Sequence, residues 1–343
     1  MTSTSVIVHE GSQVAEARRA ALGCATALQM DAETRGKVAL VATELATNLV
    51  KHGGGGEVVV VARRDDLTTA VDLLAIDSGP GMADWGRCLD DGYSTSGSPG
   101  TGLGAIRRAS EAFDVYSRPA KGTVVFARVV GRPEASRSFD SLDLGVVSVP
   151  YPGETECGDG WSVMSRPTVL RMLVVDGLGH GVSAAEAARA AVDAFQFGRD
   201  DTPTASMARI HDGLRHTRGA AAAVGEVDLS GGVVTFCGVG NIAGLIASGD
   251  GERHLVTHNG TVGHDARRMQ LFSYPWPKGS MLLLHSDGLG THWRTGDYPG
   301  LLTCHPAVAA AVLYRDFRRR RDDATVLVVG SNRHGTPVQR SAL

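Results

Sequence analysis

The chain has 343 residues, of which 43% are hydrophobic and 21% charged, and its formal net charge is -3. This length and balance predict a globular protein of two domains, and the small net charge excludes the strongly basic classes that bind nucleic acid or anionic membranes. The N-terminal stretch lacks a basic segment followed by an apolar core, and no apolar run is long enough to span a bilayer, so we expect a cytoplasmic protein without a membrane partner. The five cysteines are widely scattered, which indicates buried thiols rather than a metal or redox site.

The first 130 residues predict one helical layer over one sheet. Apolar residues at helical spacing predict helices over 12–29 and 33–51, and the glycines at 53–56 end the second helix. The runs EVVVVARR and TAVDLLAID predict neighbouring strands. After a glycine-rich stretch, a helix near 105–112 and a closing strand at TVVFARVV complete an α/β sandwich.

A polar segment with Gly, Pro and Ser, residues 131–141, is predicted to be a linker between domain 1–130 and domain 142–331. In the second domain, strands are expected at LGVVSV, RMLVVD, AAAVGEVDL, VVTFCGVG, GLIAS, MLLLHSD and ATVLVVG. Two helical stretches near 183–196 and 204–216 interrupt them, which predicts a β-sandwich covered by helices. Residues 332–343 are expected to form a flexible tail.

Three polar elements in the first domain suggest a nucleotide site. Glu44 and Asn48 lie four residues apart on one helix face, where Asn can ligate a hard cation and Glu can accept a proton. DSGPGM, which begins at Asp77, follows an apolar strand, so its carboxylate could accept a hydrogen bond from an exocyclic amine. GTGLGA opens a helix whose free N–H groups suit a phosphate chain. Each element alone is better explained as a solvated helix face or a glycine turn.

Together and in this order, the three elements resemble the N, G1 and G2 boxes of the GHKL (Bergerat) ATP-binding fold, with helices over a mixed sheet. The stretch from DDGYSTSGSPGTGLGA onward is similar to the RsbT-type serine kinases in particular. The resemblance implies that Asn48 holds Mg²⁺, Glu44 is the base toward the substrate hydroxyl, and Asp77 reads the adenine of ATP. It further implies nucleotide contacts at positions that are all glycine or threonine, namely Gly79, Gly81, Gly100, Gly102, Gly104 and Thr123.

Carboxylates recur at strand ends in the second domain. They stand in CGDGW, DGLGHG, HSDGLG and RRDDATVLVV, each beside an apolar strand where an unneutralised charge is unfavourable. One Asp-Gly is usually only a turn, but four of them separated by strands indicate a site for hard cations.

Their order, with GVGN at 238–241, resembles the PPM-type phosphatases of the SpoIIE-like and RsbX-like branch, which implies an αββα sandwich. In that family the site activates water with two Mn²⁺ or Mg²⁺ ions. The resemblance implies that Asp176 bridges the ions and that the Gly177 carbonyl supports a water. Asp159, Asp287 and Asp322 would complete the metal ligands, with Asp323 in a supporting role.

Two departures from the family pattern affect the site. Leu178 stands where many relatives have a histidine, which leaves His180 or a metal-activated water as the acid for the leaving serine, or His180 as a purely structural residue. Gly158 precedes Asp159 where relatives often carry an acidic pair, which suggests a looser second metal site. The basic run 318–321 reads as a solvated face or as an attractant for a phosphoprotein.

The sequence therefore predicts an α+β protein that combines a kinase with a phosphatase, and that phosphorylates and dephosphorylates a Ser or Thr of a STAS-domain partner in bacterial stress or sigma-factor signalling. ATP with Mg²⁺ would serve the first domain and Mn²⁺ or Mg²⁺ the second. Two alternatives remain: an ATP-dependent binding module that sequesters a sigma factor or activates a downstream phosphatase, and a phosphatase that ATP regulates.

Overall fold

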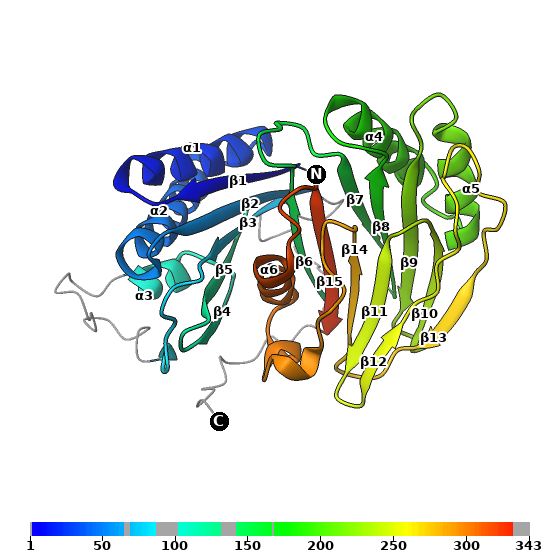
Figure 1. Ribbon diagram of the computed structural model, residues 1–343. Helices are drawn as coiled ribbons and strands as arrows, with labels where there is room; N and C mark the ends of the chain where they lie inside the picture. Colours follow the sequence, from blue (N-terminus) through cyan, green and yellow to red (C-terminus); the bar gives the residue numbers. More distant parts are fainter. Residues whose placement is uncertain (1, 65–68, 87–101, 132–141, 167, 332–343) are drawn as a thin grey trace. The chain divides into compact units, whose positions relative to one another are not determined.

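The computed structural model describes residues 2–64, 69–86, 102–131, 142–166 and 168–331 (Figure 1). Nearly all of the predicted linker and the whole predicted tail lie outside the described residues. The chain divides into two compact units. The first comprises Met1–Ser138 and Ala307–Arg315 with the C-terminal residues, and the second comprises Phe139–Pro306 and Asp316–Asn332. The two predicted domains thus have counterparts, while the exact domain limits remain a prediction.

The first unit is built on a five-stranded sheet in the order β1-β2-β3-β5-β4. Its strands are β1 (Thr2–Val8), β2 (Gly56–Arg64), β3 (Thr69–Ile76), β4 (Ala112–Arg118) and β5 (Gly122–Val130). A mixed sheet was predicted, but all four described ladders are antiparallel. The reason is that two consecutive helices connect β1 to β2, so the chain reverses three times and re-enters the sheet antiparallel to β1.

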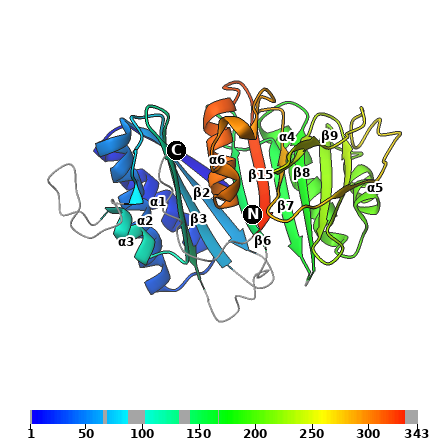
Figure 2. The ribbon, with the colours of Figure 1, turned by 90° about the horizontal axis from the view of Figure 1, so that it is seen from below.

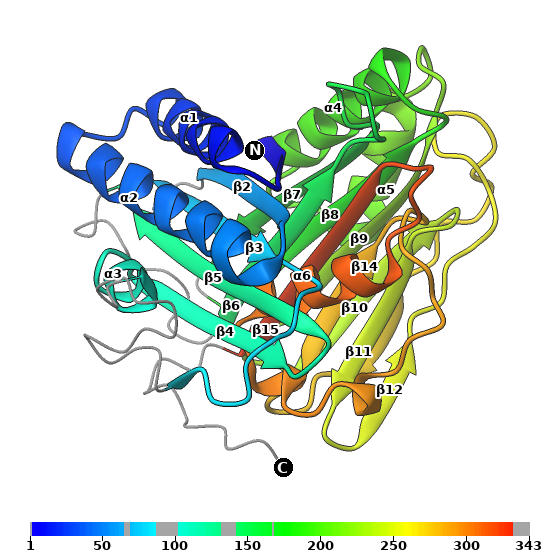
Figure 3. The ribbon, with the colours of Figure 1, turned by 60° about the vertical axis from the view of Figure 1, so that its left-hand side comes forward.

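Helices cover one face of this sheet, as Figures 2 and 3 show. They are α1 (Gly11–Ala27), α2 (Ala32–Asn48) and the short α3 (Gly102–Arg108). Asp31 begins α2 because its side chain accepts a 2.7 Å hydrogen bond from the backbone N–H of Thr34. Buried apolar residues of α1 and α2, such as Ala21, Val38 and Leu45, pack with Val58 and Leu73 of the sheet. The sandwich predicted from the sequence is therefore confirmed, although β1 and β4 were not foreseen.

The body of helix α6 (Pro306–Phe317) also belongs to the first unit, although its two ends belong to the second. The sequence PAVAAAVLYRDF is apolar on all sides, and Ala307 to Tyr314 are buried. Within the first unit, the Tyr314 hydroxyl donates to the two carboxylate oxygens of Glu57 at 3.1 and 3.0 Å. The Arg315 guanidinium lies 3.4 Å from the carbonyl oxygen of Asp77.

Two five-stranded sheets form the second unit. One has the order β13-β10-β9-β8-β7 and the other β12-β11-β14-β15-β6. The strands of the first are β7 (Asp159–Ser165), β8 (Val169–Gly177), β9 (Ala220–Asp228), β10 (Val233–Val239) and β13 (Phe272–Pro275). Those of the second are β6 (Leu142–Val149), β11 (Ala243–Ser248), β12 (Gly251–His254), β14 (Met281–His285) and β15 (Ala324–Ser331). All seven strands predicted in this half are present, whereas β7, β12 and β13 were missed.

Helices α4 (Val182–Phe197) and α5 (Pro203–Gly213) pack on the β7–β10 sheet. Alanines on α4, among them Ala187, Ala188 and Ala191, allow close approach to Leu173 and Val175 of β8. The two-domain α+β class is thus confirmed. Among the described residues, no helix is both long and apolar enough to cross a membrane.

Candidate functional sites: a nucleotide pocket and a carboxylate cluster

The N-box residues lie together at the start of α3. Glu44 and Asn48 come from one face of α2, and α3 begins beside them at Gly102. A Cβ on Gly102 would lie 3.4 Å from Asn48 Oδ1 and 3.7 Å from Glu44 Oε2. Immediately after Asn48 the helix widens into a π-helical turn, η1 (Leu49–Gly53), a distortion that is frequent at functional sites. The carboxylate, the amide and a helix N-terminus therefore converge on one spot.

Asp77 is held rigidly at the end of β3. Its Oδ1 accepts hydrogen bonds from the N–H groups of Gly79 at 2.9 Å and Thr123 at 3.0 Å. Its own N–H donates to the Thr123 carbonyl at 2.9 Å. Thr123 Oγ1 in turn lies 2.9 Å from Ser117 Oγ. The structure thus brings together the aspartate and the threonine that the family resemblance assigned to one pocket.

Burial raises the pKa of Asp77, while hydrogen bonds from Gly79 and Thr123 and the charge of Arg315 oppose the rise. Both of these hydrogen bonds end at Oδ1. Among the described residues, no hydrogen bond to Oδ2 is seen. The carboxylate therefore keeps an acceptor oxygen for a ligand amine.

Glycine is required around this aspartate by close backbone contacts. A Cβ on Gly79 would lie 2.4 Å from the Gly53 carbonyl oxygen, and one on Gly81, where φ is +67°, would lie 2.0 Å from the Arg118 carbonyl oxygen. Gly104 is buried in α3, whereas Gly100 lies outside the described residues. Close backbone contacts therefore require glycine at Gly79 and Gly81, beside Asp77.

In the second unit, Asp159 and Asp176 stand opposite each other on β7 and β8. Ser286, which follows β14, donates a 2.6 Å hydrogen bond to Asp159 Oδ2. This bond joins the two sheets, and the Thr325 N–H of β15 donates to Ser286 Oγ at 3.0 Å within the sheet of β14 and β15. Gly177 must be glycine because a Cβ there would lie 2.3 Å from the Ala184 carbonyl oxygen of α4.

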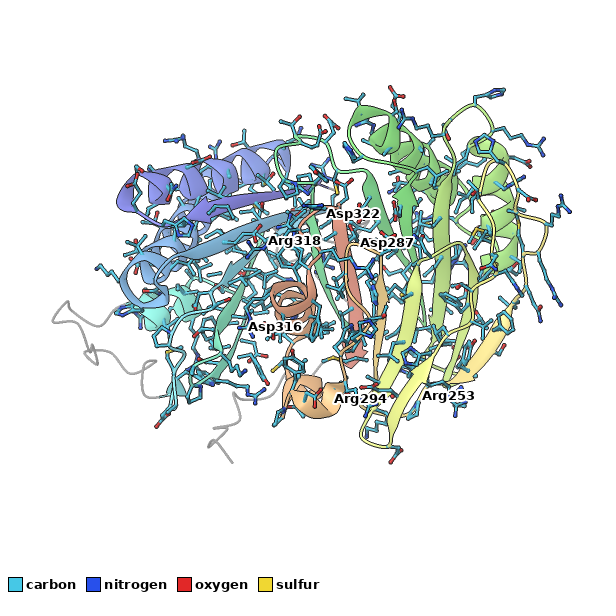
Figure 4. All side chains as sticks on the ribbon, viewed as in Figure 1. Arg253, Asp287, Arg294, Asp316, Arg318 and Asp322 are labelled. Carbon is cyan, nitrogen blue, oxygen red and sulfur yellow. The ribbon has the colours of Figure 1, made fainter. Side chains whose placement is uncertain are left out.

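Asp287 and Asp322 lie close together at one end of β14 and β15 (Figure 4). Burial, repulsion by Asp287 and a hydrogen bond shared with Asp287 raise the pKa of Asp322. Asn241 donates a 2.7 Å hydrogen bond to Asp287 Oδ2. Asn241 belongs to the GVGN segment, so sequence reasoning found the segment but assigned this side chain no role.

Asp323, predicted to have a supporting role, lies next to Asp322 directly before β15. It is buried, and its Oδ1 accepts a 2.8 Å hydrogen bond from the Tyr151 N–H. Its Oδ2 fills the space beside Gly158, where a Cβ would lie only 2.7 Å away. Gly158 therefore makes room for the Asp323 carboxylate.

The five carboxylates repel one another strongly. Burial, repulsion by Asp159 and repulsion by Asp287 raise the pKa of Asp176 to about 9. Burial is also the main cause that raises the pKa of Asp159 to about 8. Buried like charges of this kind are neutralised by metal ions or by protons.

These residues fit divalent cations. Among the described residues, Asp159 Oδ1 and Asp323 Oδ2 are buried oxygens without a hydrogen-bond partner. Orphaned carboxylate oxygens are the ligands that Mg²⁺ and Mn²⁺ prefer. Within the same described part, no three His, Cys, Asp or Glu side chains are already drawn together at ligand distance.

His180 lies beyond Asp176 on the loop that leads into α4. Its ring stacks on Tyr151 with centroids 4.7 Å apart, and its Nδ1 lies 3.2 Å from Glu154 Oε1. The side chain is 55% exposed. Because Tyr151 also contacts Asp323, this histidine borders the carboxylate cluster, while its role as an acid remains untested.

Two family models match the chain. Residues 8–129 match the "Histidine kinase-like ATPase domain" and residues 166–332 match "Stage II sporulation protein E (SpoIIE)". The chain therefore combines a GHKL-like ATPase domain with a PPM-type serine/threonine phosphatase domain of the SpoIIE family.

Curated relatives match each half separately. The "Phosphoserine phosphatase RsbX" of Bacillus subtilis (strain 168) is 26% identical over 40% of this chain and 69% of its own length. The "Serine/threonine-protein kinase RsbT" of the same organism is 28% identical over 33% of this chain and 86% of its own length. The predicted resemblance to a fusion of these two types is thereby confirmed.

Solved structures agree on the fold. A chain described under "The bacterial stressosome: a modular system that has been adapted to control secondary messenger signaling" is 30% identical, with a TM-score of 0.50 over 55% of this chain and 98% of that one. RsbX in complex with magnesium has a TM-score of 0.50 at 20% identity, over 57% of this chain and 98% of that one.

Proposed function

We propose that this chain is a switch protein whose first unit phosphorylates, and whose second unit dephosphorylates, one Ser or Thr of a STAS-domain partner. The observation that carries the proposal is that both halves keep their reactive carboxylates in a usable arrangement: Glu44 beside Asn48 at Gly102, and Asp159 opposite Asp176. The similarity to RsbT, RsbX and a stressosome-related structure supports the choice of partner. Because ATP is the donor, we place the protein in the cytoplasm.

In the kinase half, the residues supply position and charge, which is what phosphoryl transfer mainly requires. Asp77 accepts from the adenine amine, and its fixed rotamer selects against a base that offers an acceptor there. The N-terminus of α3 at Gly102 presents free N–H groups to the phosphates. Glu44, within reach of the same point, accepts the proton of the partner's hydroxyl, and the Asn48 amide oxygen would hold Mg²⁺.

In the phosphatase half, Asp159, Asp176, Asp287 and Asp322 would hold two Mg²⁺ or Mn²⁺ ions, and we add Asp323 to this set. Bound metal would supply positive charge for the phosphoryl oxygens and activation of a water. Ser286 orients Asp159 and Asn241 orients Asp287, so both ligands are held by a second hydrogen bond. His180 stands where a proton could pass to the leaving serine oxygen.

The test incubates the purified full chain with Mg-ATP, Mn²⁺ and a STAS-domain protein, and follows the intact mass of that protein. Asp176→Asn should accumulate a partner that is heavier by one phosphoryl group, the wild type should hold less, and Glu44→Ala should give none. Glu16→Ala, which changes an exposed glutamate on α1, is the matched control and should behave like the wild type. Loss of phosphorylation in this control would mean that any surface change has the same effect, and the assignment to Glu44 would fail.

A different result would favour the alternative function. If ATP binds but no variant ever phosphorylates the partner, the first unit is a nucleotide-dependent binding module fused to an active phosphatase. A pull-down of the partner with and without ATP then separates binding from turnover. If ATP instead changes the phosphatase rate of Glu44→Ala, the nucleotide regulates the second unit without phosphoryl transfer.

A further inference from the structure

An arginine that no motif singled out lies against the DGLGHG loop. On β8 and β9, Gly177 pairs with Ala220, and the ladder continues with the Leu178 N–H donating to the Gly219 carbonyl at 3.1 Å. One step further, Arg218 faces Gly179. A Cβ on Gly179 would lie 3.1 Å from Arg218 Nη1, so the guanidinium rests directly on the backbone of this glycine.

The turn that carries Arg218 is fixed on both sides. The Gly219 N–H donates to Thr217 Oγ1 at 3.0 Å, and Thr217 Oγ1 donates to the Leu214 carbonyl at 2.8 Å. His264 Nε2 lies 3.1 Å from the Thr217 carbonyl oxygen. Gly219 has φ of +80°, and a Cβ there would lie 2.7 Å from the His264 ring. The backbone below Arg218 is therefore pre-organised, which reduces the entropy that a ligand contact must overcome.

Arg218 is exposed and has no ion-pair or hydrogen-bond partner within the part of the chain that the structure describes. Its neighbours differ, since Arg189 pairs with Glu156 at 2.7 Å and Arg215 pairs with Asp212 at 3.0 Å. A cation that rests on a glycine three residues after Asp176, and that forms no ion pair among the described residues, is available for an anion brought by a ligand.

The distance is suitable for a substrate of the carboxylate cluster. Gly179 follows Asp176 by three residues, so the two Cα atoms lie at most about 10 Å apart, and the turn at Gly179 shortens this span. A phosphoryl group bound to metals at Asp176 still exposes oxygens on the side away from the metals. Arg is the side chain best suited to such oxygens, because its planar fork donates two parallel hydrogen bonds.

Charge supplies a second argument. Five carboxylates carry up to five negative charges and two divalent cations only four positive ones, so an arriving phosphate dianion meets no net attraction without a further cation.

We propose that Arg218 is a substrate-positioning residue that binds the phosphoryl group of the phosphoserine or phosphothreonine as it enters the metal site. This inference rests on the proposed phosphatase function. The substrate class it names is a phosphate monoester dianion, recognised at its phosphoryl oxygens and not at flanking residues.

The test measures steady-state kinetics of the Mn²⁺-loaded full chain with p-nitrophenyl phosphate and with a phosphoserine peptide. Arg218→Ala should raise KM for both substrates about tenfold and leave kcat within about twofold, because one charge-assisted hydrogen-bond pair is lost from the bound state. Arg218→Lys should restore part of the loss, since it keeps the charge without the fork. The inhibition constant of inorganic phosphate should rise in parallel in Arg218→Ala.

Arg215→Ala is the matched control, because it removes an exposed but ion-paired arginine three residues away, and its KM should stay at the wild-type value. An unchanged KM for p-nitrophenyl phosphate in Arg218→Ala, with an active wild type, overturns the inference and leaves the phosphatase standing. A change seen only with the peptide overturns the phosphoryl assignment in favour of a flanking acidic residue. A wild type that hydrolyses neither substrate overturns the proposed phosphatase, and this inference with it.

Discussion

Replacing Asp176 by asparagine should stabilise the metal-free second unit. Burial and repulsion by neighbouring carboxylates raise the pKa of Asp176 to about 9 from 3.8. The folded state therefore binds a proton that the unfolded chain has released, and the free energy of unfolding falls as pH rises from about 4 to about 9. At pH 7 the difference of 3.2 pH units above the unfolded pKa corresponds to about 4 kcal/mol.

Asparagine carries no charge in either state, so it escapes this cost, although its buried amide leaves polar atoms unpaired at about 1 to 3 kcal/mol. The net gain is about 1 to 3 kcal/mol, or about 2 to 10 °C in Tm for a unit of this size. Trp161 reports the transition, because it is buried two residues from Asp159. The gain should grow with pH in EDTA up to about pH 9 and vanish toward pH 4.

Saturating Mn²⁺ should reverse the order. Metal at about 100 times its Kd stabilises the wild type by about 2.7 kcal/mol, and Asp176→Asn loses most of this term. Asp193→Asn, which changes an exposed aspartate of α4, is the control and should match the wild type in both conditions. A metal-free Asp176→Asn that is no more stable than the wild type at pH 8 would refute the reasoning from carboxylate repulsion.

Three further outcomes are expected. Asp77→Asn should weaken ATP binding at least about tenfold in isothermal calorimetry, because a carboxylate acceptor becomes partly a donor, and equal ATP affinity would refute the adenine role. Gly158→Asp should lower Mn²⁺ affinity measured in the same way, because its Cβ meets the Asp323 carboxylate at 2.7 Å, and tighter binding would show that the family's acidic pair fits here after all. Thr123→Val should lower ATP affinity only about threefold, because the backbone hydrogen bonds to Asp77 remain and only the side-chain bond to Ser117 is lost. Complete loss of ATP binding would contradict this assignment of the backbone and side-chain roles of Thr123.

The sequence predicted most strands and helices that have strong periodic patterns, but it missed β1, β4 and helix α6 as well as three strands of the second unit. β7, in which Asp159 is the first residue, reads as a turn in CGDGW because glycines flank the aspartate, and pairing with β8 makes it a strand. β12 and β13 are four-residue edge strands with mostly exposed side chains, so they carry little hydrophobic signal.

The candidate sites were predictable as far as motifs reach. Glu44, Asn48, Asp77 and Thr123 were named from the resemblance, and the structure brings Glu44 to Asn48 and Asp77 to Thr123. The adjacent aspartates Asp322 and Asp323 could not be ranked from sequence, whereas the structure shows that Asp323 is buried.

Arg218, Asn241 and Ser286 were missed for a different reason. Each reaches its site through strand register or a turn rather than through a motif. The sequence offered one indication for Ser286 and Asn241, because Ser286 directly precedes Asp287 and Asn241 is the last residue of the GVGN segment.

Helix α6 bears on how this chain could be taken apart. A protein made of two fused domains is usually expected to have one domain boundary, at which the domains can be separated or exchanged. Here the chain leaves the second unit at Pro306, contributes Ala307–Arg315 to the first, and returns at Asp316. The segment is buried, and Tyr314 and Arg315 bond to Glu57 and Asp77 of the first unit. If two such proteins were recombined at residues 132–141 alone, the buried segment Ala307–Arg315 of the first unit would be inherited with the second unit. Recombination between such fusions should therefore favour inheritance of both units together.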